Sequence, residues 1–220
     1  MKHENFNPKL LLVGGFGHLL CWLGGDMLLY FVPNGPLDTM KLFGYEATVQ
    51  MLQGVNPFQF TISGVAGTVA MMLALVGYYQ IYQFLKPVAQ KASKVALVGA
   101  LLTCIPGAVM HFTCTSMLWY FVKSGATKAA HDIMLSVFME TAATTMMCNT
   151  CVFMVCIPLL ITVVKGKTCL PKWSWIVNTI PLTFMAGILF AGMGAMNVAS
   201  AMMFWGLYLL IKKFGSISWN

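Results

Sequence analysis

The feature that most constrains this sequence is a series of apolar runs, each long enough to cross a lipid bilayer as a helix. A spanning helix needs roughly 20 apolar residues, and the longest run here covers about residues 129–164. Of the 220 residues, 59% are hydrophobic and only 9% are charged, whereas soluble domains carry about 25% charged residues. So few charges cannot cover a surface that faces water. The sequence therefore predicts an all-α integral membrane protein. Strands of a β-barrel would alternate over about ten residues, and these runs do not.

The predicted fold is one transmembrane domain, residues 1–220, folded as a bundle of six helices. Proline-containing breaks at residues 33–36 (PNGP), 56–57 (NP) and 86–87 (KP) separate the apolar runs. Residues 37–57 hold apolar side chains at helical spacing beside charged ones, which predicts an amphipathic helix at the outer membrane interface. The predicted spans are about residues 9–32, 58–85, 94–122, 129–164, 173–192 and 197–211.

Lysines set the predicted orientation of this bundle. The chain has 13 lysines, no arginine and a net charge of +7. With a cytoplasmic N-terminus, ten lysines fall in cytoplasmic segments and three in outer segments. This asymmetry predicts that both termini are cytoplasmic and that the protein is a multi-pass protein of the cell membrane. Nucleic acid is not an expected partner, because the lysines lie between apolar runs and arginine, the best bidentate phosphate ligand, is missing.

Three ionisable side chains lie inside predicted spans: Asp26, His111 and Glu140. Asp26 and His111 each lie 17 residues beyond the lysine that opens their span, which places both roughly 25 Å from the cytoplasmic face. Glu140 descends from the outer face and falls at a similar depth. A charge at the centre of a span costs about 2.5–3.5 kcal/mol on insertion scales. We therefore expect the three groups to converge on a polar pocket in the outer half of the bundle.

The helix faces around these three groups define the predicted site. His111 is the candidate general base or metal ligand, Asp26 would orient it or share the metal, and Glu140 would be the second acid or base. An imidazole and two carboxylates can hold a divalent metal, so the same three are the candidate metal ligands. Further polar or aromatic side chains share their faces at i+3, i+4, i+7 or i+8 spacing. These predicted substrate-binding residues are His18, Trp22, Thr115 and Thr144.

A structural role is the alternative to this site. Asp26 and His111 could form a buried hydrogen-bonded pair that joins two helices, with Glu140 facing a lipid headgroup. His18 alone is more typical of a ring bonded to a backbone carbonyl. The Cys148-Asn-Thr-Cys151 motif resembles a thiol oxidase pair, but the outer segments 33–58, 123–129 and 193–197 contain no cysteine to exchange with it.

Three short motifs resemble an uncharacterised family of bacterial membrane proteins, one of the groups defined by a domain of unknown function. They are GDMLLY at residues 25–30, GVAGTVAMMLALVGYYQIY at 64–82 and the stretch from Gly107 to His111. The similarity covers the first half of the chain. It implies a six-helix membrane protein with a shared aspartate and histidine, but it implies no activity.

Three functions fit these predictions. The first is an intramembrane enzyme, such as a hydrolase, that acts on a lipid-like substrate from the outer leaflet. The second is a small transporter in which Asp26 and Glu140 bind a cation or proton and His111 relays it, six spans being enough if the protein is a homodimer. The third is a non-catalytic binding or assembly protein. An enzyme predicts a pocket closed toward the cytoplasm, and a transporter predicts polar residues that continue to that face.

Overall fold

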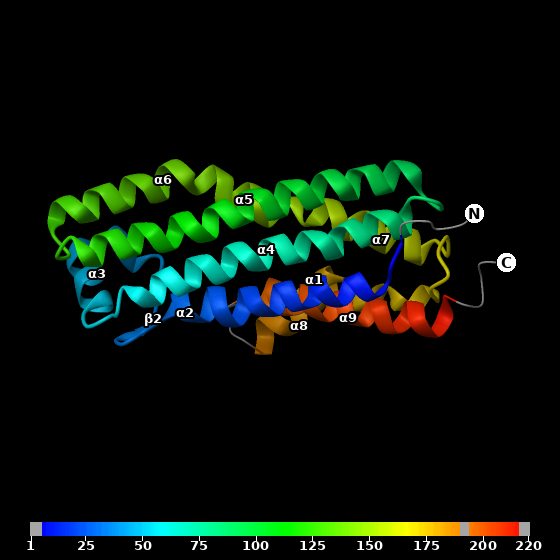
Figure 1. The fold of residues 1–220 in the computed structure, drawn as a ribbon, viewed down its shortest axis with the longest axis horizontal. Helices are drawn as coiled ribbons and strands as arrows, with labels where there is room; N and C mark the ends of the chain where they lie inside the picture. The colour runs from blue at the N-terminus through cyan, green and yellow to red at the C-terminus, as the bar shows by residue number, and fades with distance from the viewer. Residues whose placement is uncertain (1–5, 190–193, 216–220) are drawn as a thin grey trace.

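The computed structural model describes residues 6–189 and 194–215, and the regular secondary structure of this part of the chain is helical apart from one short β-hairpin. The helices run lengthwise along one axis of an elongated bundle (Figure 1). In chain order the elements are α1 (Lys9–Leu20), η1 (Cys21–Asp26), α2 (Met27–Tyr30), β1 (Phe31–Val32), β2 (Gly35–Pro36), η2 (Lys41–Phe43), α3 (Tyr45–Leu52), α4 (Phe58–Leu85), α5 (Gln90–Lys123), α6 (Lys128–Cys151), α7 (Phe153–Val164), η3 (Lys172–Val177), α8 (Thr179–Leu189) and α9 (Ala195–Phe214).

Within the described residues, five helical segments are long and apolar enough to cross a membrane. They are Lys9–Tyr30, Phe58–Leu85, Gln90–Lys123, Lys128–Val164 and Ala195–Phe214. These segments correspond to the predicted spans 9–32, 58–85, 94–122, 129–164 and 197–211. The fourth is interrupted at Val152, between α6 and α7, whereas Pro158 lies inside α7. The prediction of an all-α bundle with several candidate spans is therefore confirmed.

The predicted span 173–192 differs from the structure. Residues 172–177 form the 3-10 helix η3, and α8 has 11 residues, a length of only about 16 Å. Asn178 separates the two helices: its Oδ1 accepts the Ile180 N–H at 3.1 Å, and its Nδ2 donates to the Cys156 carbonyl at 2.9 Å. Residues 190–192 of this predicted span lie outside the described residues. A sixth full crossing is accordingly not among the spans found.

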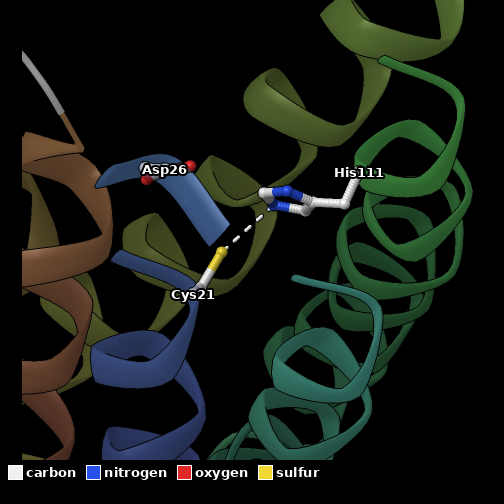
Figure 2. A group of neighbouring side chains, drawn as sticks. All are labelled: Cys21, Asp26 and His111. Atoms are coloured by element: carbon white, nitrogen blue, oxygen red, sulfur yellow. Dashed lines mark hydrogen bonds between the residues drawn. The ribbon is translucent and has the colours of Figure 1, made fainter. Parts of the chain in front are cut away.

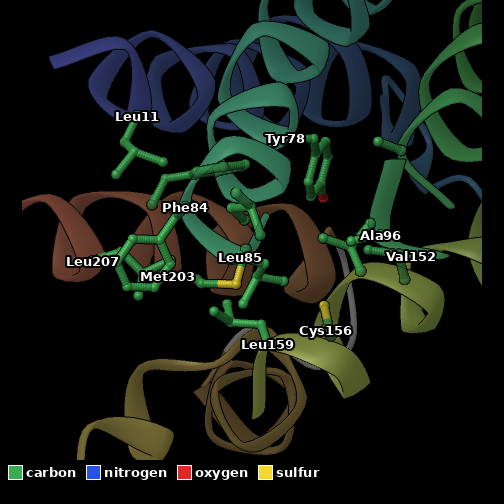
Figure 3. Close-up of a cluster of buried hydrophobic side chains, with 14 of the residues drawn as sticks. Leu11, Tyr78, Phe84, Leu85, Ala96, Val152, Cys156, Leu159, Met203 and Leu207 are labelled. Carbon is green, nitrogen blue, oxygen red and sulfur yellow. The ribbon is translucent and has the colours of Figure 1, made fainter. Parts of the chain in front are cut away.

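The two ends of the bundle have different cores. At the end where α1 begins and α9 finishes, large apolar side chains from α1, α4, α7 and α9 fill the interior (Figures 1 and 3). At the other end, η2 and α3 cover the ends of α5 and α6. There the Tyr45 hydroxyl donates to the Ala126 carbonyl at 3.0 Å, and His131 Nε2 lies 2.9 Å from the Leu42 carbonyl. The segment predicted as an interfacial helix, 37–57, is thus a cap whose apolar face packs on two helices.

Candidate metal-binding site

A π-helical turn in the first span shapes the site. Residues Cys21–Asp26 form η1, between α1 and α2. In an α-helix, residues five apart point about 140° away from one another, at 100° per residue. In a π-helix the backbone hydrogen bond joins residues five apart, so their side chains stack on one side. Cys21 and Asp26 are five apart, and the turn brings both toward the same neighbour. Ser63 of α4 donates its hydroxyl to the Gly25 carbonyl in this turn, at 2.6 Å.

That neighbour is His111 of α5. Its Nε2 lies 3.1 Å from the Cys21 thiol sulfur, and Figure 2 shows the two side chains pointing toward each other. One potential ligand atom from each of Cys21, Asp26 and His111 lies within 4.8 Å of the others. The pairing of Asp26 with His111 was expected from their depths, whereas the thiol of Cys21 was not expected to join them.

Asn197, near the start of α9, orders this group. Its Nδ2 donates to Asp26 Oδ2 at 2.8 Å and to Cys21 Sγ at 3.3 Å. Its Oδ1 therefore accepts from His18 Nδ1, at 2.8 Å. With Nδ1 protonated in a neutral ring, His18 Nε2 accepts the Tyr78 hydroxyl at 3.0 Å. Every donor in this chain of hydrogen bonds points toward Asp26, so the carboxylate is its final acceptor.

A cavity of about 340 Å³ adjoins the cluster. Asp26 and His111 line it, and α1, α2, α4, α5, α6 and α9 contribute the remaining walls. The Thr103 hydroxyl also lines the cavity and has no hydrogen-bond partner within the described part of the chain. Cys21 is 0% exposed and lies behind the two cavity-lining ligands. A small ligand or ion that enters the cavity would meet the imidazole and the carboxylate first.

Close packing by glycine leaves room for the imidazole. A Cβ at Gly67 of α4 would lie 2.8 Å from His111 Cβ and closer still to its ring, distances that real Cβ atoms do not adopt. Gly194 at the start of α9 has φ +64°, and a Cβ there would lie 2.9 Å from Asp26 Oδ2. The sequence thus allows both α4 and the α9 N-terminus to approach the ligand cluster.

The structure does not bring Glu140 to this group. Glu140 lies on an exposed face of α6, and its Oε1 accepts the Ser136 hydroxyl at 2.7 Å. The expected meeting of three groups from three spans is therefore a meeting of two of them with Cys21. The catalytic roles assigned to Asp26 and His111 stay predictions.

Only one of the four predicted substrate-binding residues, His18, is among the described residues that line the cavity. The Trp22 ring packs against Gly194 instead. Thr115 is buried and uses its hydroxyl on its own helix, donating to the His111 carbonyl at 2.8 Å. Thr144 is partly buried on α6 outside the cavity lining. Trp22, Thr115 and Thr144 therefore do not line the cavity, although each shares a helix face with an ionisable residue.

The donor set suits a borderline transition metal better than a hard cation. Thiolate, imidazole and carboxylate are the three ligand types that Zn²⁺ uses, whereas Ca²⁺ and Mg²⁺ prefer oxygen. With zinc bonds of about 2.0–2.3 Å, neighbouring ligands of a tetrahedral ion lie about 3.3–3.7 Å apart. The Cys21–His111 distance of 3.1 Å is close to that value. Three protein ligands beside a cavity leave the fourth position free, as in catalytic zinc sites.

Sequence reasoning missed three members of this arrangement. Cys21 was not among the candidate ligands, and Asn197 and Tyr78 were not connected to Asp26. The signal for Cys21 is its position five residues before Asp26 in a helix that contains Gly24 and Gly25. Such a pair is informative only if the intervening turn is π-helical, and the sequence does not show that.

The fold and the cluster together define an all-α protein with five candidate membrane spans and one candidate metal centre, within the residues described. The chain belongs to the family of unknown function DUF6796, which matches residues 1–213. This confirms the resemblance to an uncharacterised family and extends it from the first half to nearly the whole chain. No curated protein and no solved structure matches the chain.

Proposed function

We propose that this protein is a multi-pass metalloenzyme of the cell membrane that hydrolyses a lipid-like substrate. The observation that carries the proposal is the group of three ligand atoms, one from each of Cys21, Asp26 and His111, beside a cavity inside a bundle of apolar helices. Zn²⁺ is the metal that these donors suit best. Both termini are cytoplasmic in this proposal, since the beginning of α1 and the end of α9 share one end of the bundle (Figure 1) and most lysines lie there. The short helix α8, which packs against α9, takes the place of a sixth full crossing.

Cys21, Asp26 and His111 would hold the metal and leave one of its positions open toward the cavity. A metal held there would supply an activated water, the nucleophile that hydrolysis of an ester or amide needs. The water oxygen would join the acyl carbon, and the alcohol or amine would leave with the water proton. Asn197 holds the Asp26 carboxylate in place, and Cys21 supplies the innermost ligand, away from the cavity.

A transporter is the second candidate, because the hydrogen bonds from Asp26 continue through Asn197 and His18 to Tyr78. Tyr78, however, is 0% exposed and belongs to the apolar cluster that fills the end of the bundle where α1 begins and α9 finishes (Figure 3). The polar groups therefore lead into a closed, apolar region. This arrangement favours the enzyme, for which a pocket closed toward the cytoplasm was expected.

The experiment is elemental analysis of the purified full-length protein after zinc loading and removal of free metal. We expect about one zinc per chain, as one tetrahedral site requires, with loss of most of it in His111→Ala and in Asp26→Asn. Glu140→Gln is the matched control, because it removes a carboxylate charge that lies outside the cluster, and it should keep the metal. Metal-free wild-type protein, or equal metal in all variants, would overturn the proposal.

A further inference from the structure

A second cavity lies between α4 and α5, on a surface that the bundle leaves uncovered. It has a volume of about 440 Å³, within the range of about 300–1,000 Å³ that small-molecule pockets show. Its walls are almost entirely aliphatic, aromatic or sulfur-containing side chains. The principal ones are Met72, Leu75, Ile105, Val109 and Phe112. We call this cavity the α4–α5 groove.

The groove offers hydrocarbon contacts and almost no polar ones. Met72 is 61% exposed and Phe112 is 60% exposed, so large apolar surfaces face outward on two candidate membrane spans. Thr68 lines the groove, but its hydroxyl already donates to the Ala108 carbonyl at 3.2 Å. Apart from the Thr113 hydroxyl at one edge of the lining, a charged or polar ligand would find few partners in the groove. A hydrocarbon chain, in contrast, would bury apolar surface against the other side chains.

Met71 connects the groove with the metal-site cavity. Its side chain is 6% exposed and lines both cavities. On the cavity side it packs on Gly107, where an added Cβ would lie 2.9 Å from the Met71 sulfur. Methionine side chains are unbranched and adapt readily to a changed neighbour. Met71 thus separates the apolar groove from the polar cavity with an unbranched, adaptable side chain.

We propose that the α4–α5 groove holds the hydrocarbon chain of the lipid-like substrate, while the polar end passes Met71 into the cavity beside His111. This inference rests on the proposed function and adds the substrate class: a molecule with one long acyl or isoprenoid chain. The length and position of the groove along α4 and α5 fit such a chain. The groove extends over Thr68–Leu75 of α4 and Cys104–Thr113 of α5, roughly 10–14 Å of helix. Phe112 adjoins His111, so a chain lying toward Leu75 would leave its polar end level with the metal site.

Photolabelling in nanodiscs tests the groove. The full-length protein is placed in phosphatidylcholine nanodiscs with a long-chain fatty acid that carries a diazirine at mid-chain, and labelled residues are mapped by mass spectrometry. We expect labelling of Met72 and Phe112 severalfold above that of Phe184, an exposed residue of α8. Ala108→Trp and, as a second variant, Met72→Trp should each remove this excess. Ala143→Trp, an exposed alanine on α6, is the matched control and should leave it unchanged.

A second fatty acid with the diazirine beside its carboxyl group tests the connection. We expect it to label Met110, which lines the metal-site cavity, and we expect Met71→Trp to abolish that label while the mid-chain label persists. Even labelling of all exposed apolar positions, or labelling of Met110 that Met71→Trp does not change, would overturn the proposal. So would a dimer that Ala108→Trp dissociates, because the groove would then be a contact between two copies.

Zinc content measured on the same samples separates this inference from the proposed function. Zinc-free wild-type protein with the expected groove labelling would contradict the proposed metalloenzyme and, with it, the substrate role of the groove. One zinc per chain with even labelling would contradict only the proposal that the groove binds the hydrocarbon chain. Ala108→Trp should retain its zinc, because Ala108 is not among the ligands.

Discussion

Asp26 and Glu140 are two carboxylates inside long apolar helices, and the structure gives them different surroundings. Asp26 is the last residue of a π-helical turn, is partly buried and accepts a hydrogen bond from Asn197, 171 residues away in the chain. Glu140 lies exposed on a regular α-helix and accepts a hydrogen bond from Ser136, one turn earlier. Asp26 is therefore part of a site made by several helices, whereas the hydrogen bond of Glu140 stays within its own helix.

The depth of an ionisable residue in a predicted span therefore does not by itself identify a site. The helix that carries Asp26 packs against both α4 and α9, so its polar groups are enclosed by helices from distant parts of the chain. The helix that carries Glu140 packs mainly against α5, which leaves much of its surface uncovered. Asp26 and Glu140 therefore differ because neighbouring helices cover the helix face that carries Asp26 and leave the face that carries Glu140 exposed. Their positions along the helices do not explain the difference.

Among substitutions outside the three ligands, the largest effect on metal affinity is expected from removing the Asn197 amide that orders the site. Asn197→Ala deletes the hydrogen bonds to Asp26 and Cys21, and loss of such a supporting partner typically lowers metal affinity about 10–100-fold. Zinc affinity measured by competition with a chelator checks this. Asn149→Ala is the control, because Asn149 lines the cavity but donates only to the Thr145 carbonyl on its own helix. Equal affinity in both variants would show that Asn197 does not position the ligands.

The next effect comes from closing the space beside His111. Gly67→Ala forces the imidazole or α4 to move, and overpacking of this kind costs about 1–3 kcal/mol. The midpoint of thermal unfolding in detergent should fall accordingly, and zinc binding should weaken. Gly187→Ala is the matched control, since nothing lies within 4 Å of a Cβ there. An equal midpoint for Gly67→Ala and wild type would mean that α4 does not approach His111 as described.

A smaller effect on stability is expected at the cap formed by η2 and α3, where His131 has a structural role. His131 is 1% exposed and its Nε2 lies 2.9 Å from the Leu42 carbonyl. His131→Phe keeps a ring but removes this hydrogen bond, at a cost of about 0.5–1.5 kcal/mol of unfolding free energy. Zinc content should not change. Zinc loss in this variant would contradict the separation between the cap and the site.

The smallest effect is expected at Glu140. Surface substitutions away from special features usually change stability by less than about 0.5 kcal/mol. Glu140→Gln should therefore unfold at the wild-type temperature within experimental error. Differential scanning fluorimetry in the same detergent measures it beside Asp26→Asn. A marked loss of stability in Glu140→Gln would erase the contrast between the two carboxylates.

The sequence was sufficient to predict an all-α bundle and five of its long helices, because runs of apolar residues broken by proline report directly on helix length. It did not predict the break between η3 and α8, where Asn178 makes two hydrogen bonds. A contact between that side chain and the backbone of α7 cannot be read from local composition. The cap over α5 and α6 was likewise predicted as a helix but not as a buried contact.

Two members of the candidate site could be anticipated from the sequence, and three could not. Asp26 and His111 were found because charged or ionisable groups in apolar spans are costly and must face the interior. Cys21 was missed because a thiol in an apolar span carries no such cost, so nothing in the sequence distinguishes a ligand from a packing residue. Asn197 was missed because its partners lie on α1 and η1, and their pairing depends on how α9 packs.

X-ray absorption at the zinc edge, on zinc-loaded full-length protein, tests whether Cys21, Asp26 and His111 bind one metal. We expect one sulfur at about 2.3 Å with nitrogen or oxygen ligands at about 2.0–2.2 Å, and loss of the sulfur in Cys21→Ser. A zinc shell without sulfur in the wild-type protein, or a sulfur that persists in Cys21→Ser, would contradict it.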